Sequence, residues 1–235
     1  MTTGRAAKCL MSVEEQQIRQ GIRTPRAAAV AGIVFAVLLI TSEVLVWLYV
    51  PSVASAQAGE ISRHSKELTL AMNLRPFSGI AFLWFVGVVR NRLGSLEDRF
   101  FATVFLGSGL LYVAMMFMGG AVAEAVLTLL ATRSDALLSS GSFDLAREEV
   151  FRITSIYATK MAGVFMISTS TIFTQTQVVP RWIAFLGYGL ALVLLLTAVQ
   201  ARLLAVVFPL WVMVISVFVL IHEPNSQQAG TSSQA

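Results

Sequence analysis

Four charged residues lie in or beside long apolar stretches, where a charge is costly and chemistry is one reason to keep it. Glu43, Arg75 and Lys160 fall inside such stretches, and Glu124 stands at the edge of another. At the centre of a membrane helix each charge costs about 2.5–3.5 kcal/mol. A carboxylate can take up and release a proton, while the two basic groups can hold an anionic ligand or tune that carboxylate. The set predicts a polar cavity. The alternative is an interhelical ion-pair network that only fixes packing.

The depths of these residues favour one group. Glu43, Arg75 and Lys160 are each seven residues from the same-side end of their apolar stretch, which places them about 10 Å below one membrane boundary at 1.5 Å rise per residue. Glu124 stands a turn or two above them. Two acids and two bases at similar depth predict a neutral cluster that opens to the outer face.

A second unusual feature adjoins Arg75. In the segment Asn73-Leu-Arg75-Pro76, the proline removes a backbone donor and crowds the carbonyl of Met72. The segment therefore predicts a kinked or broken helix at Asn73 and Pro76. Broken helices at membrane depth occur where they line a cavity or are buried in protein.

Enzyme motifs find little support. Glu148-Glu149-Val-Phe-Arg152 is one residue shorter than the Glu-Glu-x-x-x-Arg motif of CaaX-type intramembrane metalloproteases, and the two histidines fall near opposite membrane faces. Gly107-Ser108-Gly109 resembles the serine loop of rhomboid proteases, yet no apolar stretch holds a histidine to act as base. No catalytic residue, metal site or cofactor is predicted, and an enzyme is unsupported.

The composition requires a membrane setting for these charges. Of 235 residues, 56% are hydrophobic and 13% charged, against about 45–50% and about 25% in soluble domains. This excludes a secreted globular protein, a disordered tail and a nucleic-acid module. The single cysteine, Cys9, excludes an intramolecular disulfide framework. The net charge of +4 is explained by basic residues in cytoplasmic loops rather than by nucleic acid.

The apolar stretches predict an all-α polytopic transmembrane bundle. A bilayer core about 30 Å thick needs roughly 20 apolar residues per helix. Six segments meet this requirement: 27–50, 68–89, 100–123, 153–173, 182–199 and 203–221. The last two are divided only by the turn at 200–202.

The regions outside these spans are predicted as loops and tails. Residues 51–67 and 124–152 form outer loops, the second centred on Ser139-Ser-Gly-Ser142, with a helical extension of the fourth span from Asp144. Residues 1–26 form an amino tail with a short surface helix, 27–221 the transmembrane domain, and 222–235 a disordered carboxyl tail.

Orientation follows from the basic residues. The amino tail, the loop at 90–99 and Arg181 hold nine Lys and Arg, and the other loops hold six, so both termini are predicted to be cytoplasmic. The sequence before Ala56 also resembles a signal-peptidase site. The preceding apolar stretch is longer than the roughly 7–15 residues of a signal peptide, which favours an uncleaved anchor.

Two stretches are also similar to known sequences. One runs from Pro76-Phe-Ser-Gly to Arg90 and on through Glu97-Asp-Arg-Phe to Gly109, and the other is Lys160-Met-Ala-Gly to Thr171 with Pro180-Arg-Trp182. They resemble an uncharacterised family of small six-span membrane proteins of bacteria, particularly actinobacteria. The resemblance implies six helices in the bacterial cytoplasmic membrane, and it implies nothing about an activity. Lys160 falls inside the pattern, and Arg75 departs from it.

Two functional hypotheses remain. The first is a non-enzymatic accessory or structural membrane component, embedded in the lipid bilayer and associating with itself or with another membrane protein through its glycine-rich faces. The alternative is a small solute or proton-linked transporter that uses Glu43, Arg75 and Lys160. The two halves of the chain show no inverted repeat, which weighs against a carrier.

Overall fold

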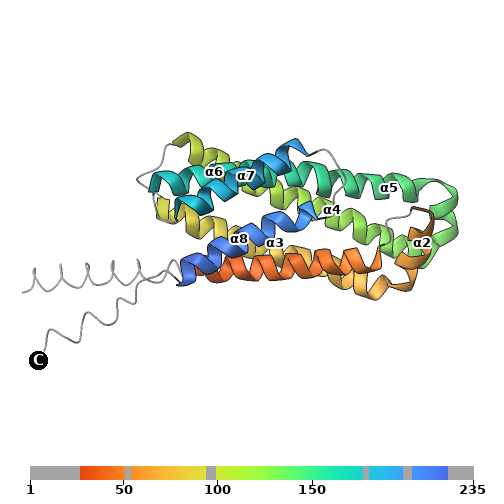
Figure 1. Cartoon of the computed structure of the whole chain (residues 1–235). Coiled ribbons are helices and arrows are strands. Elements are labelled where there is room, and N and C mark those ends of the chain that lie inside the picture. Colours follow the sequence, from red (N-terminus) through yellow and green to blue (C-terminus); the bar gives the residue numbers. More distant parts are fainter. Residues whose placement is uncertain (1–26, 51–53, 94–98, 177–179, 198–202, 222–235) are drawn as a thin grey trace, which may run out of the picture.

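The chain folds into an elongated bundle of helices (Figure 1). The computed structural model describes residues 27–50, 54–93, 99–176, 180–197 and 203–221, which are 96% helical and contain no strand. The all-helical prediction is therefore confirmed for these residues. The elements are the first helix (Ala27–Tyr49), α2 (Ala54–Arg63), α3 (Ser65–Leu93), α4 (Arg99–Ser139), α5 (Ser142–Phe151), η1 (Arg152–Ala158), α6 (Thr159–Thr176), α7 (Arg181–Leu196) and α8 (Leu204–Ile221).

Five helical stretches are long and apolar enough to cross a membrane. They contain five of the six predicted spans, with 142–175 forming one continuous stretch through α5, η1 and α6. The sixth prediction, 182–199, corresponds to α7, which has only 16 residues because it ends at Leu196. At 1.5 Å per residue α7 is about 24 Å long, shorter than a bilayer core of about 30 Å. Six spans are therefore not established by helix length.

The centre of the bundle is a cluster of aromatic rings, one from each of five elements. Neighbouring rings in this aromatic core lie 4.7–6.5 Å apart between centroids, mostly edge to face or tilted, the arrangements that aromatic pairs prefer. Its members are Phe35, Phe82, Tyr112, Phe165 and Phe208, all at most 7% exposed.

The predicted outer loop at 124–152 is wrong: apart from a turn at 140–141, these residues are helical. α4 continues to Ser139, with a kink at Arg133, and α5 begins at Ser142. The turn lies where Ser139-Ser-Gly-Ser142 was predicted to centre it, and Gly141 has the positive φ of 70° that glycine adopts without strain. The helical extension predicted from Asp144 is confirmed as part of α5. Charged residues end the apolar stretch near Glu124, but the helix-forming alanines and leucines after it continue α4.

A second hydrophobic core holds these extra helices together. Ile61 of α2, Leu68 of α3, Leu130 of α4 and Phe143 of α5 pack in one cluster, each at most 9% exposed. We call residues 54–72 and 123–151 the helical cap. The predicted loop at 51–67 contributes α2 and the start of α3 to it.

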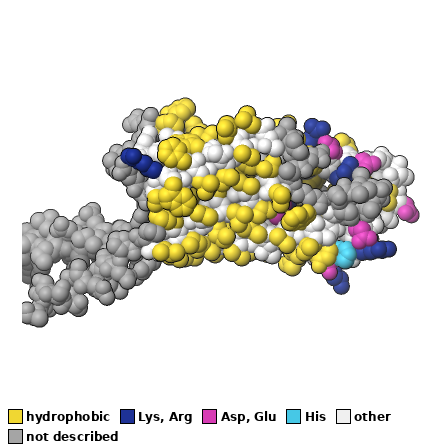
Figure 2. Space-filling model, in the orientation of Figure 1, with side chains coloured by type: hydrophobic (Ala, Val, Ile, Leu, Met, Phe, Trp, Pro, Cys, Tyr) yellow, Lys and Arg dark blue, Asp and Glu magenta, His cyan; other side chains and the backbone are white. Residues whose placement is uncertain are grey.

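The cap lies at one end of the bundle, and the described chain ends, Ala27 and Ile221, lie at the other (Figure 1). Figure 2 shows hydrophobic side chains over the bundle and most of the visible charged side chains gathered on the cap. The predicted tails at 1–26 and 222–235 and the turn at 200–202 lie outside the described residues.

Candidate functional site

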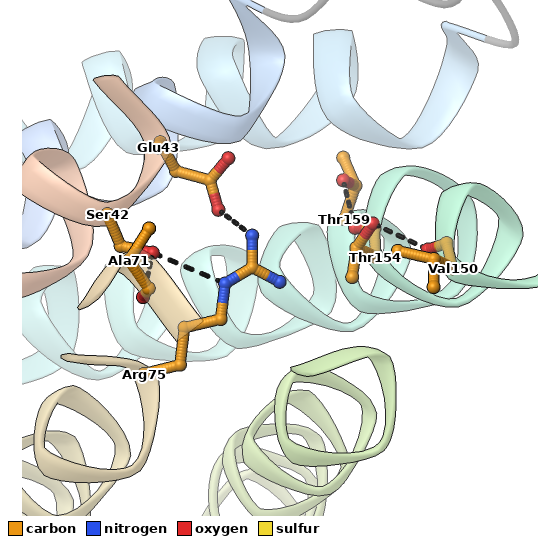
Figure 3. Close-up of polar contacts among 7 residues, drawn as sticks. All are labelled: Ser42, Glu43, Ala71, Arg75, Val150, Thr154 and Thr159. Carbon is orange, nitrogen blue, oxygen red and sulfur yellow. Dashed lines mark hydrogen bonds and ion pairs between the residues drawn. The ribbon is translucent and has the colours of Figure 1, made fainter. Parts of the chain in front are cut away.

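Two of the four predicted site residues form a buried ion pair. Glu43 lies near the end of the first helix, and Arg75 lies on α3. The distance between Nη2 of Arg75 and Oε1 of Glu43 is 3.0 Å (Figure 3). The Arg75 side chain is 6% exposed and that of Glu43 is 22% exposed. The first helix and α3 run in opposite directions, so their matching depths bring the two charges together.

Ser42 is a second side chain that binds Arg75. Nε of Arg75 donates a hydrogen bond to the Ser42 hydroxyl oxygen (3.3 Å), and that hydroxyl donates to the carbonyl of Ala71 (2.8 Å). Ser42 thus makes two hydrogen bonds from the first helix to α3, and the two residues that it binds are one helical turn apart. Sequence reasoning overlooked Ser42, although it directly precedes Glu43 in the sequence.

A break at Asn73 and Pro76 is wrong, because α3 is helical from Ser65 to Leu93 with the proline inside it, while the alternative of a kink there stays a prediction. Asn73 and Pro76 are both exposed on the outside of the bundle. Packing against α4 accompanies this helical segment, and Ser42 of the first helix donates to the carbonyl of Ala71 one residue before Met72.

Lys160 lies outside the ion pair. Its ammonium group donates to three backbone carbonyls at the end of α7, those of Leu194 (2.9 Å), Leu195 (2.6 Å) and Thr197 (2.9 Å). The last carbonyls of a helix have no partner within the helix. Lys160 of α6 supplies those donors from the neighbouring helix and also complements the negative end of the α7 dipole.

Glu124 lies outside the ion pair as well. Its side chain is exposed on α4 where the helix enters the cap. The predicted four-residue cluster is therefore wrong: Glu43 and Arg75 pair, Lys160 binds carbonyls, and Glu124 faces outward. Depth along a helix follows from rise per residue, but the direction in which a side chain points does not.

A small cavity adjoins the ion pair. Its volume is about 50 Å³, and its polar lining residues are Glu43, Arg75, Tyr112, Thr154, Ser155 and Thr159. Leu39, Leu194, Leu204 and Phe208 are among its apolar lining residues. It lies at the level where α7 ends and α8 begins, which is also the level of the ion pair.

One wall of the cavity is the π-helix η1. The Thr154 hydroxyl donates to the carbonyl of Val150 (2.7 Å), and the Thr159 hydroxyl donates to the carbonyl of Thr154 (3.4 Å), five residues back (Figure 3). π-helical turns are rare and occur frequently at functional sites. The sequence signal for this wall was the group of hydroxyl residues at 154, 155 and 159 inside a predicted span, and it was missed.

The described residues contain no group of three or more His, Cys, Asp or Glu that could hold a metal ion. His64 lies in the cap, stacked on Tyr49 with ring centroids 4.6 Å apart. Cys9 and His222 lie outside the described residues.

Comparisons with known proteins give no family for this chain. No protein-family model matches it, and neither does any curated protein or solved structure. The resemblance to small six-span bacterial membrane proteins therefore stays a prediction.

Proposed function

We propose that this chain is a six-span integral membrane protein that acts as a non-enzymatic accessory or structural component. The observation that carries the proposal is that the basic groups inside the bundle are engaged by neighbouring helices. Arg75 is bound by Glu43 and Ser42, and Lys160 by three carbonyls. Charges used in this way fix helix packing and do not need a substrate.

The surface of the bundle supports membrane insertion. Large apolar side chains on different helices face outward, with Trp84 70%, Phe185 66% and Leu48 69% exposed. In water such a surface would drive aggregation, whereas lipid tails solvate it. Lys160 supports α7 as the sixth crossing, because it provides donors for carbonyls that would otherwise be unpaired at the end of a short helix.

The proposed setting is the bacterial cytoplasmic membrane, with both termini cytoplasmic and the cap outside. The basic residues near the amino terminus and in the loop at 90–99 support this orientation. The first helix begins and α8 ends at the end of the bundle opposite the cap (Figure 1), as an even number of crossings requires. We expect the bilayer to be the first partner of the protein.

Association with a second copy or another membrane protein is supported by glycines that face open space. A Cβ added at Gly87, Gly107 or Gly189 would meet no described heavy atom within 4 Å. By contrast, Gly79 and Gly119 already lie against side chains of the same chain. Glycines without such neighbours let another helix approach closely.

A small solute or proton-linked transporter is the second candidate. It is favoured by one observation, that Glu43 lines the cavity and keeps part of its surface accessible. The volume of about 50 Å³ is far below the roughly 300–1,000 Å³ of sites that bind drug-sized molecules.

The two candidates are separated by flux measurements on reconstituted vesicles. Purified protein, Glu43→Gln and Glu148→Gln would be placed in liposomes that contain a pH-sensitive dye, and proton uptake would be followed after a pH jump. Glu148 is a matched control, since it pairs with Arg152 (2.9 Å) on the exposed cap. We expect all three to give the rate of empty liposomes, with only Glu43→Gln less stable to heat. Proton flux that is lost in Glu43→Gln and kept in Glu148→Gln would overturn the accessory role.

A further inference from the structure

The cavity beside Glu43 and Arg75 has polar groups on two facing sides. The guanidinium group of Arg75 lies between Glu43 on one side and Thr154 and Thr159 on the other (Figure 3). Glu43 comes from the first helix, Arg75 from α3, and Thr154 and Thr159 from η1 and the start of α6. Three helical stretches, namely the first helix, α3 and the continuous stretch through η1 and α6, therefore direct polar atoms to a space of about 50 Å³.

These polar groups have spare hydrogen-bonding capacity of both kinds. Arg75 uses Nε and Nη2, and among the described residues its Nη1 has no hydrogen-bond partner, which leaves a donor. Glu43 uses Oε1 toward Arg75, which leaves Oε2 as an acceptor. The hydroxyls of Thr154 and Thr159 donate to backbone carbonyls, so their oxygens remain able to accept.

The balance of these groups selects the chemistry of a ligand. The positive charge of Arg75 is offset by Glu43, so the pair gives neither an anion nor a cation a net electrostatic attraction, although a small ion can still enter. An uncharged molecule that both donates and accepts hydrogen bonds can satisfy both sides. A water molecule needs about 10–15 Å³ of such volume, so the cavity has room for about three to five waters or one comparably small solute.

The cavity is lined by residues of the aromatic core on one side and by an exposed residue close to the cap on another. Tyr112 and Phe208 line it and belong to the aromatic core, with their ring centroids 4.7 Å apart. Ser155 also lines the cavity and is exposed at the surface, on the turn of η1 nearer to the cap. The walls contributed by Leu194 and Leu204 are the facing ends of α7 and α8.

We propose that this cavity is a one-sided vestibule that binds water and small uncharged hydrogen-bonding solutes, which reach Glu43 and Arg75 from the cap side only. The proposal rests on the membrane placement proposed above. Water in this space would lower the cost of keeping two charges within the bundle, as is usual for ionisable residues at membrane depth. The aromatic core stops the path, so the vestibule does not conduct.

Cysteine accessibility tests the proposal, because Cys9 is the only native cysteine. In a Cys9→Ala background, Thr154→Cys places a thiol on the cavity wall. Ser170→Cys is the matched control, because it also replaces a hydroxyl by a thiol. Ser170 lies further along the same continuous helix, is 0% exposed and does not line the cavity. Ag⁺, a small membrane-impermeant ion that reacts with thiols, is added in chloride-free buffer to right-side-out or inverted membrane vesicles. The thiols that remain are then alkylated under denaturing conditions and counted by mass spectrometry.

We expect Thr154→Cys to react at least tenfold faster than Ser170→Cys, and only when Ag⁺ is added on the cap side. Slow reaction of both thiols, or reaction of Thr154→Cys from the opposite side, would overturn the vestibule. Recovery of the protein in the soluble fraction would instead contradict the membrane placement. If Thr154→Cys fails to fold, Ala158→Cys, which lines the same cavity and is 4% exposed, gives the same readout.

The class of ligand is tested by protection of the same thiol. Acetamide and acetate have the same number of non-hydrogen atoms but differ in charge. We expect a high concentration of acetamide to slow the reaction of Thr154→Cys with Ag⁺ at least twofold, with no effect of sodium acetate relative to sodium nitrate. Protection by acetate alone, or by neither, would overturn the assignment to uncharged solutes.

Discussion

Arg75 and Lys160 are two basic residues at similar depth in one bundle, and their charged groups bind different kinds of partner. Arg75 sits between the first helix and α3, where its charge is offset by the carboxylate of Glu43. Lys160 of α6 points to the end of α7, where its ammonium group binds three backbone carbonyls and, among the described residues, no carboxylate. One region is held by a pair of opposite charges and the other by a charge placed at the end of a helix.

The difference determines what each region loses when one partner is removed. Loss of Glu43 would leave a full positive charge that is 6% exposed without its counter-charge. Loss of the Lys160 ammonium would leave neutral carbonyls that lack a donor, which costs less per group. The Glu43–Arg75 region should therefore be the more sensitive of the two, and three substitutions test this order.

The largest effect is expected for Glu43→Gln. Breaking a buried ion pair at one partner costs about 3–5 kcal/mol, and we expect a value near the lower limit because Glu43 is 22% exposed. Glu148→Gln, which breaks an exposed pair on the cap, should cost less than about 1 kcal/mol. Equilibrium unfolding in mixed detergent micelles measures both. Equal losses in the two variants would contradict the difference between the regions.

A double variant shows whether the charge or the contact matters. In Glu43→Gln with Arg75→Gln no unpaired charge remains, so part of the loss should be recovered relative to Glu43→Gln alone. Additive losses would mean that the two side chains act independently and that the ion pair contributes little.

The sequence predicted the apolar helices well, because each of them is specified by a long local run of residues. The pairing of Glu43 with Arg75 could also be predicted from the sequence, since both residues lie seven residues from the ends of adjacent spans that face the same side of the membrane. The partners of Lys160 were not, because backbone carbonyls are present at every position and carry no sequence signal. Only the place where α7 stops, at Leu196, reveals them.

The cap was missed for a related reason. Hydropathy ended the third span at Ala123, because the following residues include Glu124 and Arg133. The helix continues because Leu127 and Leu130 find a buried surface on α2, α3 and α5, and that surface exists only in the folded chain. A segment that is too polar for lipid can still be a helix when a second core covers one of its faces.

A smaller effect is expected for Lys160→Met, which keeps an unbranched side chain of four atoms and removes the ammonium group. Three carbonyls at the end of α7 would lose their shared donor, at a cost of about 2 kcal/mol. The change should be local, so hydrogen exchange of the amides in the last turn of α7 should accelerate more than that of α3. If both helices exchange faster by the same factor, Lys160 would contribute to the whole bundle and the two regions would not be independent.

The smallest effect is expected for Ser42→Ala, which tests the Glu43–Arg75 region without changing its charge. The Ser42 hydroxyl accepts from Arg75 and donates to Ala71, whereas Ser78, on the other helix of the same pair, makes a single bond to the Phe35 carbonyl (3.3 Å). Because hydrogen bonds to charged groups are worth more than neutral ones, Ser42→Ala should cost about 1–2 kcal/mol and Ser78→Ala about half as much. Both serines are 0% exposed, so the loss of packing is comparable in the two variants. A larger loss for Ser78→Ala would mean that Arg75 depends on Glu43 alone and that its bond to Ser42 adds nothing to the stability of the bundle.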